Sequence, residues 1–159
     1  MSGRVGDETI VLAAAVAADV DFLVAANLAM ARETEAKELD PERLRSGVER
    51  AFSDPARGRY FVARVGGERA GCLMVTREWS DWRDGWFWWI QSVWVRPELR
   101  GRGVYRSLHG HVRNLAIAAG DVVGLRLYVD RDNEVAQRTY GALGMAPTDY
   151  LLYEETFER

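Results

Sequence analysis

The sequence predicts a mixed α/β fold in which about four helices flank a central, mostly antiparallel sheet. Short β-branched or aromatic runs alternate with segments whose apolar residues recur three and four positions apart, and glycine or proline separates them. With 159 residues, 48% of them hydrophobic, the chain is long enough to bury a core. Because no repeat or linker divides it, we expect residues 1–159 to form a single domain.

An unbroken apolar run at residues 10–18 is the first element. A membrane-spanning helix needs about 20 apolar residues, so this run is too short to cross a bilayer. Asp19 and Asp21 also place charges directly after the run. We therefore expect a strand over 10–14, at the edge of the sheet, that leads into a helix over about 17–34.

A second helix and a hairpin are expected next. Asp40 can cap the free amides of a helix, and Pro41 suits the first helical position. Residues 60–65 and 70–76 then flank Gly66-Gly67, which is typical of a β-hairpin.

Strands and helices alternate in the second half of the chain. Along residues 86–95, aromatic or β-branched side chains occupy both odd-numbered and even-numbered positions. This pattern predicts a strand covered on both faces. The elements expected after it are a helix from about 102 to 119, a strand over 122–129, a helix over 133–143 and a final strand over 150–156.

All six tryptophans lie between Trp79 and Trp94. Strict alternation along residues 86–95 places two sets of side chains on opposite faces of that strand. One set is Trp86, Trp88, Ile90 and Trp94, and the other is Phe87, Trp89, Val93 and Val95. Most of these rings are therefore expected in the core, whereas Trp79 and Trp82 fall in a polar loop.

Charge and cysteine content exclude several classes of protein. Acidic residues outnumber basic ones by 24 to 21, so no nucleic-acid footprint is expected. The single cysteine, Cys72, forms no internal disulfide and cannot build a metal site alone. We expect a cytoplasmic protein with no bound metal and no membrane partner.

A glycine-rich turn, Arg100 to Tyr105, lies between the strand at 86–95 and the following helix. Glycine lets backbone amides approach a ligand, and amides at a helix N-terminus favour anions such as a diphosphate. The turn lacks the Gly-Lys-Ser/Thr of a P-loop, and Arg106 stands where a dinucleotide fingerprint needs its third glycine. On these residues alone, a purely structural turn is an equally good interpretation.

This turn, with the preceding Val93-Trp94-Val95-Arg96-Pro97 and the later segment 133–145, resembles the GNAT superfamily of N-acetyltransferases. The family pattern is Arg or Gln, two residues, Gly, one residue, then Gly or Ala. Arg100, Gly103 and Tyr105 fall on these positions, and Tyr105 departs from the pattern. The resemblance extends over nearly the whole chain in the order of its elements.

The resemblance implies a splay between the fourth and fifth strands, in which the pantetheine arm of acetyl-CoA pairs like a short extra strand. Backbone groups of the fourth strand would bind that arm, and amides of the turn would hold the diphosphate. Acetyl-CoA is then the cosubstrate. The residues implied in its binding are Val93, Trp94, Val95, Arg100, Gly101, Arg102, Gly103, Val104, Tyr105 and Asn133.

The resemblance also implies a catalytic tyrosine. Tyr140 matches the tyrosine that gives a proton to the departing thiolate, although it also shares a helical face with apolar residues and could be a core residue. Many relatives carry a glutamate base where this chain has Gln91, which cannot accept a proton. A water chain, or a carboxylate from Glu33, Glu78 or Asp81, would have to replace it.

The acceptor is expected to be a primary amine, on either a small molecule or a peptide. The expected acceptor contacts are Glu33, with Glu35 beside it, and Trp79, Trp82, Trp89 and Gln91. A second interpretation is a non-catalytic binding module of the same fold that uses the tryptophan-rich loop as an aromatic cage. Homodimers are common in the family, so a homodimer is a further expectation.

Overall fold

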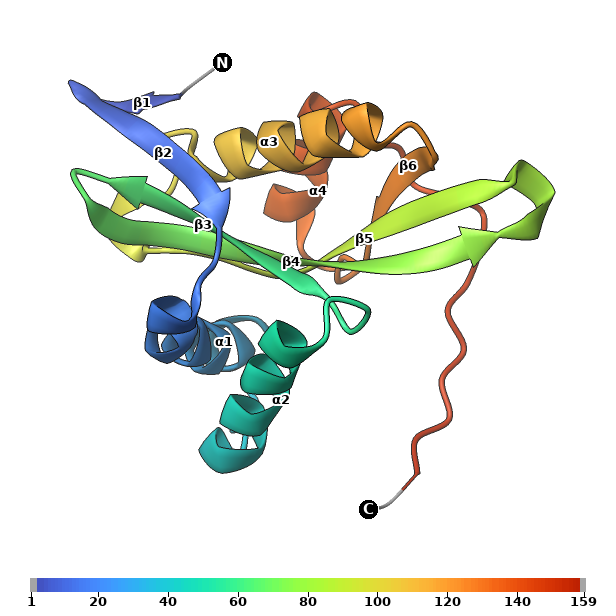
Figure 1. Cartoon of the computed structure of the whole chain (residues 1–159), viewed down its shortest axis with the longest axis horizontal. Coiled ribbons are helices and arrows are strands. Elements are labelled where there is room, and N and C mark those ends of the chain that lie inside the picture. Colours follow the sequence, from blue (N-terminus) through green and yellow to red (C-terminus); the bar gives the residue numbers. More distant parts are fainter. Residues whose placement is uncertain (1–2, 158–159) are drawn as a thin grey trace. The chain divides into compact units, whose positions relative to one another are not determined.

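The computed structural model describes residues 3–157, which divide into two compact units at Tyr128 and Val129. Each unit is described by itself. The first contains a six-stranded sheet and three α-helices (Figure 1). Its elements are β1 (Arg4–Val5), β2 (Glu8–Ala14), α1 (Val20–Glu35), α2 (Pro41–Ser53), β3 (Arg59–Val65), β4 (Glu68–Ser80), β5 (Gly85–Val95), α3 (Val104–Ala119) and β6 (Val122–Leu127). Three short 3-10 turns are η1 (Ala17–Asp19), η2 (Asp81–Arg83) and η3 (Pro97–Leu99).

The strands of the sheet follow the order of the chain, from β1 to β6. Neighbours are antiparallel except β5 and β6, which are parallel because α3 carries the chain back between them. The mixed, mostly antiparallel sheet is therefore confirmed. The expectation that the first long strand lies at the edge is wrong, since β1 pairs along its outer side through Arg4 and Thr9.

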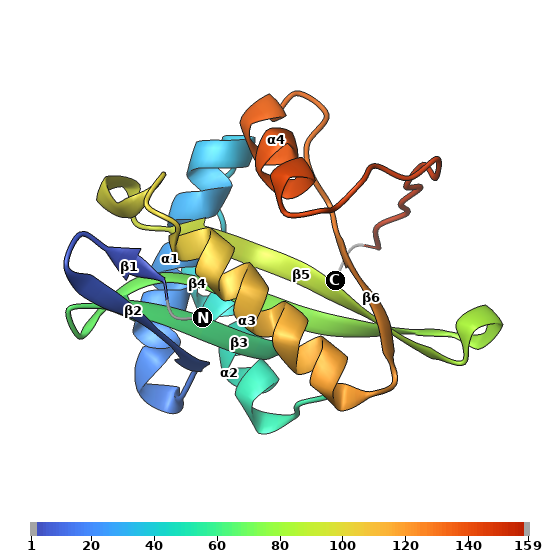
Figure 2. The ribbon, with the colours of Figure 1, turned by 90° about the horizontal axis from the view of Figure 1, so that it is seen from above.

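Helices cover both faces of this sheet. In Figures 1 and 2, α1 and α2 lie against one face and α3 crosses the other. Leu23, Val48 and Val62 pack in the core on the α1 and α2 side, while Leu73 and Leu108 pack in the core under α3. As expected, α2 begins after Asp40, whose carboxylate accepts hydrogen bonds from the first amides of the helix.

A β-bulge interrupts β5 at Ser92 and Val93. Gln91 pairs with Met74 and Trp94 pairs with Cys72, so two residues of β5 stand opposite one residue of β4. The bulge reverses the alternation of the side chains beyond it. The expected faces are therefore wrong for three residues. Trp94 packs with the α1 and α2 core, and Val93 and Val95 pack with Ile90 under α3.

A buried carboxylate joins the start of α1 to the sheet. Asp19 is fully buried, and its carboxylate accepts hydrogen bonds at 2.6 Å from both Arg64 and Arg69. It also accepts one from the Val16 amide at 3.0 Å. Two strands and the N-terminal end of α1 are thus held together by one side chain.

The second unit, from Val129 on, contains one helix, α4 (Glu134–Ala142). The strand expected over 150–156 is absent, and residues 145–157 have no regular secondary structure. A strand needs a partner strand, and the described part of this unit offers none. Across residues 3–157, no helix is both long enough and apolar enough to cross a membrane.

Candidate active site

The sheet opens between β5 and β6. These strands pair only from Trp86 to Ile90 on β5, whereas β4 follows β5 as far as Val95. Within the first unit, no strand pairs with the second edge of residues 91–95. The splay expected between the fourth and fifth strands is therefore present, and it lies between β5 and β6 because the short β1 adds one strand to the count. A peptide-like ligand could pair with this free edge.

The glycine turn comes directly after that free edge. Gly101 and Gly103 have φ values of +73° and +85°, a backbone conformation that other residues adopt only with strain. A Cβ on either would meet nothing within 4 Å, so the backbone is open on this side. Gly103 is the N-cap of α3 and offers no side-chain acceptor. No side chain therefore caps the N-terminus of this 16-residue helix, a position that favours anions.

The side chains of the turn differ in their exposure and direction. Val104 is 1% exposed and Tyr105 packs against the same core, so these two residues can offer a ligand only their amides. Arg102 is exposed. Arg100 turns back instead, and its Nε donates to the Val95 carbonyl at 2.9 Å.

Arg100 also contacts the end of α1. Its Nη2 donates to the carboxylate of Glu33 at 2.6 Å. Glu33 was expected to contact the acceptor amine, but here its carboxylate lies against the glycine turn. The pairing joins residues 67 positions apart, and no sequence pattern indicates it.

On the α1 and α2 face, polar and aromatic side chains line the sheet at the point where β5 and β6 separate. Gln91 donates to the Thr76 hydroxyl at 2.5 Å. Glu78 accepts from the Trp89 indole at 3.0 Å and from Arg126 at 2.7 Å. Arg126 lies 3.5 Å from the centre of the Phe87 ring, and Trp89 stacks on Tyr128 with ring centres 4.4 Å apart. We call this set of residues the sheet platform.

Sequence reasoning named Glu78, Trp89 and Gln91 as candidate site residues. It missed Thr76, Arg126 and Tyr128. Thr76 is paired with Trp89, whereas Gln91 is paired with Met74, so Thr76 reaches Gln91 only diagonally across the two strands. Arg126 and Tyr128 become neighbours of Trp89 only through the parallel pairing of β5 with β6, which is a tertiary feature.

Trp79 and Trp82 lie elsewhere, at the tip of the β4–β5 hairpin. The expectation that both fall in a polar loop is wrong for Trp79, which belongs to β4, whereas Trp82 lies in η2. Trp79 contacts Trp86 edge-on at 5.0 Å, and the Arg77 guanidinium covers the Trp86 ring at 5.0 Å. Trp82 is 86% exposed.

By strand alternation, Trp79 and Trp86 lie on the face of the sheet opposite their platform neighbours Glu78 and Phe87. The tip still borders the platform, because the Arg83 guanidinium lies 5.3 Å from the centre of the Phe87 ring.

The carboxylates considered as a general base all have partners. Glu33 pairs with Arg100, and Glu78 pairs with Arg126. Asp81 accepts a hydrogen bond from the Trp82 amide at the hairpin tip. At the splay itself, Gln91 supplies an amide that cannot take a proton.

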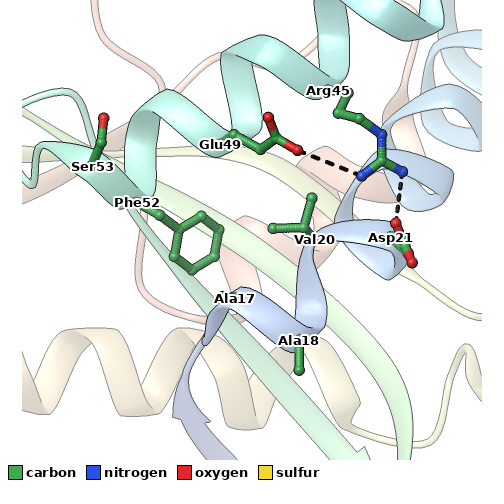
Figure 3. Close-up of a pocket in the computed structure, with 8 residues that line it drawn as sticks. All are labelled: Ala17, Ala18, Val20, Asp21, Arg45, Glu49, Phe52 and Ser53. Atoms are coloured by element: carbon green, nitrogen blue, oxygen red, sulfur yellow. Dashed lines mark hydrogen bonds and ion pairs between the residues drawn. The ribbon is translucent and has the colours of Figure 1, made fainter.

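A hollow on the α1 and α2 side is distinct from the splay (Figure 3). It encloses about 530 Å³. Its lining residues are Ala17, Ala18, Val20, Asp21, Arg45, Glu49, Phe52 and Ser53. None of them belongs to β5, β6 or the glycine turn, and Arg45 is already paired with both Asp21 and Glu49.

The remaining expected site residues belong to the second unit. Asn133 caps α4, where its side-chain oxygen accepts from the Ala136 amide at 3.0 Å. Tyr140 lies on the same helix, and burial raises the pKa of its hydroxyl. The hydroxyl is therefore protonated at neutral pH, as a proton donor must be.

Residues 24–145 match the model of the Acetyltransferase (GNAT) family. A search of curated proteins finds no match. Among solved structures, the chain is similar to a possible acetyltransferase from Clostridium difficile 630, with 39% identity and a TM-score of 0.88 over 94% of this chain and 99% of that one.

Two more distant structures share the fold. A predicted acetyltransferase from Clostridium acetobutylicum, solved with acetyl-CoA, is 14% identical with a TM-score of 0.76, over 92% of this chain and 96% of that one. AAC(6')-Iy, solved with the bisubstrate analog CoA-S-monomethyl-acetylneamine, is 15% identical with a TM-score of 0.74, over 93% and 98%.

Proposed function

Because this chain belongs to the acetyltransferase (GNAT) family, we propose that it transfers the acetyl group of acetyl-CoA to a primary amine on a small molecule or peptide. The amine attacks directly while both substrates are bound. The observation that carries this proposal is the free edge of β5 at residues 91–95, which leads straight into the glycine turn at the start of α3.

The residues around this edge fit the cosubstrate. Amides from Gly101 to Tyr105 would hold the diphosphate, because two glycines with positive φ leave the backbone accessible at a helix N-terminus. Backbone groups of Val93 and Val95 would pair with the amides of the pantetheine arm. Acetyl-CoA supplies an acetyl group activated as a thioester.

The acceptor amine must lose a proton. An amine with a pKa of about 10.4 is neutral in roughly one molecule in 2,500 at pH 7. Gln91 cannot take that proton, and its side-chain amide is held by Thr76. Glu33 and Glu78 are paired with arginines. We therefore assign proton removal to solvent water, which predicts that kcat/KM rises with pH toward the pKa of the acceptor amine.

Tyr140 is proposed as the general acid that protonates the departing thiolate at sulfur. This role rests on the family pattern, and the raised pKa of the hydroxyl supports it. Asn133 is proposed as a pantetheine contact on the same ground.

The alternative of a non-catalytic aromatic cage has less support. A cage needs open ring faces around a cation. At the hairpin tip, Trp79 already packs edge-on against Trp86, and Arg77 covers the Trp86 face. Trp82 alone leaves its ring largely exposed there.

Calorimetric titration with coenzyme A tests the cofactor site. Gly103→Ala should weaken binding at least tenfold, because alanine disfavours the φ of +85° that this N-cap adopts. Gly110→Ala is the matched control, since this glycine lies within α3 with a negative φ and a Cβ there would meet nothing within 4 Å. Absence of coenzyme A binding by the wild-type protein would refute the proposal.

A further inference from the structure

Ser92 has a backbone conformation that is unusual for its residue type. Its φ is +51°, in the left-handed region, where serine is strained. Such strain persists only where the surroundings enforce it, and it is concentrated at functional sites. Ser92 comes just after the last residues at which β5 pairs with β6, and it lies in the bulge opposite β4. The strained residue therefore lies where the free edge begins.

Buried polar side chains surround this residue on the α1 and α2 face. Burial raises the pKa of the Tyr60 hydroxyl, on β3, while the neighbouring side chains of Ser92 and Asn27 act on it as hydrogen-bond partners and lower it. Tyr60 is 8% exposed and Asn27 is 6% exposed. Asn27 also donates to the Leu23 carbonyl of its own helix at 2.9 Å, which fixes its amide.

The Ser92 backbone is held as well. Its carbonyl accepts from the thiol of Cys72 at 3.9 Å, across the strand pair. Tyr60 of β3 and Cys72 of β4 thus lie against the bulge, and Asn27 of α1 lies behind Tyr60. On its outer side, within the first unit, no strand pairs with it.

We propose that Asn27, Tyr60 and Ser92 form a buried clamp that holds the bulge in β5 and thereby positions the acyl group of the bound thioester. The inference rests on the proposed function, because the acyl group enters only with the cosubstrate. Without the clamp, Ser92 can relax toward a negative φ and shift the register of residues 92–95. The three residues are positioning residues, since they act through the backbone of β5.

The clamp is not explained by packing alone. Tyr60 already has an apolar role, stacking on Phe52 with ring centres 6.2 Å apart. A phenylalanine would keep that contact and lose only the hydroxyl. Tyr60→Phe therefore separates the clamp from the core.

Calorimetric titration should compare the affinity for acetyl-CoA with the affinity for coenzyme A. Both ligands carry the same diphosphate, so its contribution cancels in the ratio of the two affinities. In Tyr60→Phe, the ratio of the two affinities should change at least fivefold from its wild-type value, while coenzyme A affinity stays within twofold. Tyr153→Phe, which removes a hydroxyl from a side chain that is 88% exposed, is the matched control and should change neither quantity.

A double-mutant cycle tests whether Tyr60 acts through Ser92. Ser92→Gly adopts a positive φ without strain, so the backbone no longer needs the clamp. In that background, Tyr60→Phe should change the affinity ratio less than twofold. Equal effects of Tyr60→Phe in both backgrounds would overturn the proposed route through the bulge, and an unchanged ratio in the single variant would overturn the clamp itself.

Hydrogen exchange distinguishes failure of the clamp from failure of the proposed function. In the ligand-free protein, Tyr60→Phe should speed amide exchange at residues 91–95 at least tenfold relative to Tyr153→Phe. A wild-type protein that binds neither ligand would refute the proposed function, and unchanged exchange at residues 91–95 would refute the clamp independently of any ligand.

Discussion

Arg100 donates to the Glu33 carboxylate at 2.6 Å and to the Val95 carbonyl at 2.9 Å. One guanidinium therefore connects the last turn of α1, the C-terminal end of β5 and the glycine turn. Both charged side chains of the ion pair are more than a third exposed, so the pair stabilises the fold by at most about 1 kcal/mol. The pair instead fixes the direction of the Arg100 side chain, next to the turn that we propose holds the diphosphate.

Glu33→Ala should therefore act on the cosubstrate and leave the acceptor unaffected. Loss of the carboxylate frees the guanidinium, and we expect the KM for acetyl-CoA to rise about threefold while the KM for the amine is unchanged. Glu38→Ala is the matched control, since it breaks a similar exposed pair with Arg32. A rise confined to the KM for the amine would contradict this prediction and support Glu33 as an acceptor contact.

Trp89→Ala should raise the acceptor KM more than Trp82→Ala does. Trp89 belongs to the sheet platform at the start of the splay, whereas Trp82 lies in η2 at the hairpin tip. Steady-state kinetics with the amine varied at saturating acetyl-CoA measures the difference. A larger effect of Trp82→Ala would place the acceptor at the hairpin tip instead.

Tyr140→Phe should lower kcat at least tenfold and leave coenzyme A affinity within twofold. The hydroxyl is needed only when the thiolate departs, so its removal affects the chemical step and not binding. Burial raises the pKa of this hydroxyl, so no loss of activity from its ionisation is expected between pH 7 and about pH 10. Wild-type turnover by the variant would remove the assignment.

Asp19→Asn should reduce the free energy of unfolding by about 2 kcal/mol at pH 7, because it removes the charge of a buried carboxylate that binds two partly exposed arginines. Burial raises the pKa of the Asp19 carboxyl, but hydrogen bonds from Val16, Arg69 and Arg64 outweigh burial and leave the pKa below its usual value of 3.8.

The lowered pKa of Asp19 determines how its contribution to the free energy of unfolding depends on pH. A carboxyl with a lowered pKa stabilises the folded state above its unfolded pKa, and the stabilisation is lost as pH falls through the folded pKa. Urea denaturation should therefore show a difference between wild type and Asp19→Asn that is full at pH 7 and narrows below about pH 4. Asp21→Asn, whose side chain is 87% exposed, should have little effect at either pH.

Much of the fold could be predicted because its signals are local. Asp40 and Pro41 begin α2, Gly66 and Gly67 join β3 to β4, and the four α-helices are those that the apolar spacing indicates. The glycine turn was predicted from composition and from its place between a strand and a helix.

The features that could not be predicted depend on tertiary contacts. Ser92 is compatible with a regular strand, so neither its positive φ nor the bulge and the reversed face of Trp94 could be read from the local sequence. The segment 150–156 has a strand-like composition, yet its own unit offers no partner strand. Glu33 and Arg126 acquire their roles from residues distant in the chain.

Thiol release from acetyl-CoA in the presence of a panel of primary amines, with the products identified by mass spectrometry, tests the central claim most directly. The one cysteine, Cys72, is fully buried, and burial raises its pKa to about 12, so we expect the protein's own contribution to a thiol assay to be small. We expect release that requires both acetyl-CoA and an amine, an N-acetylated product, and loss of both signals in Gly103→Ala at low acetyl-CoA concentration. Binding of acetyl-CoA without amine-dependent release across the panel would contradict the assignment and favour a non-catalytic binding module.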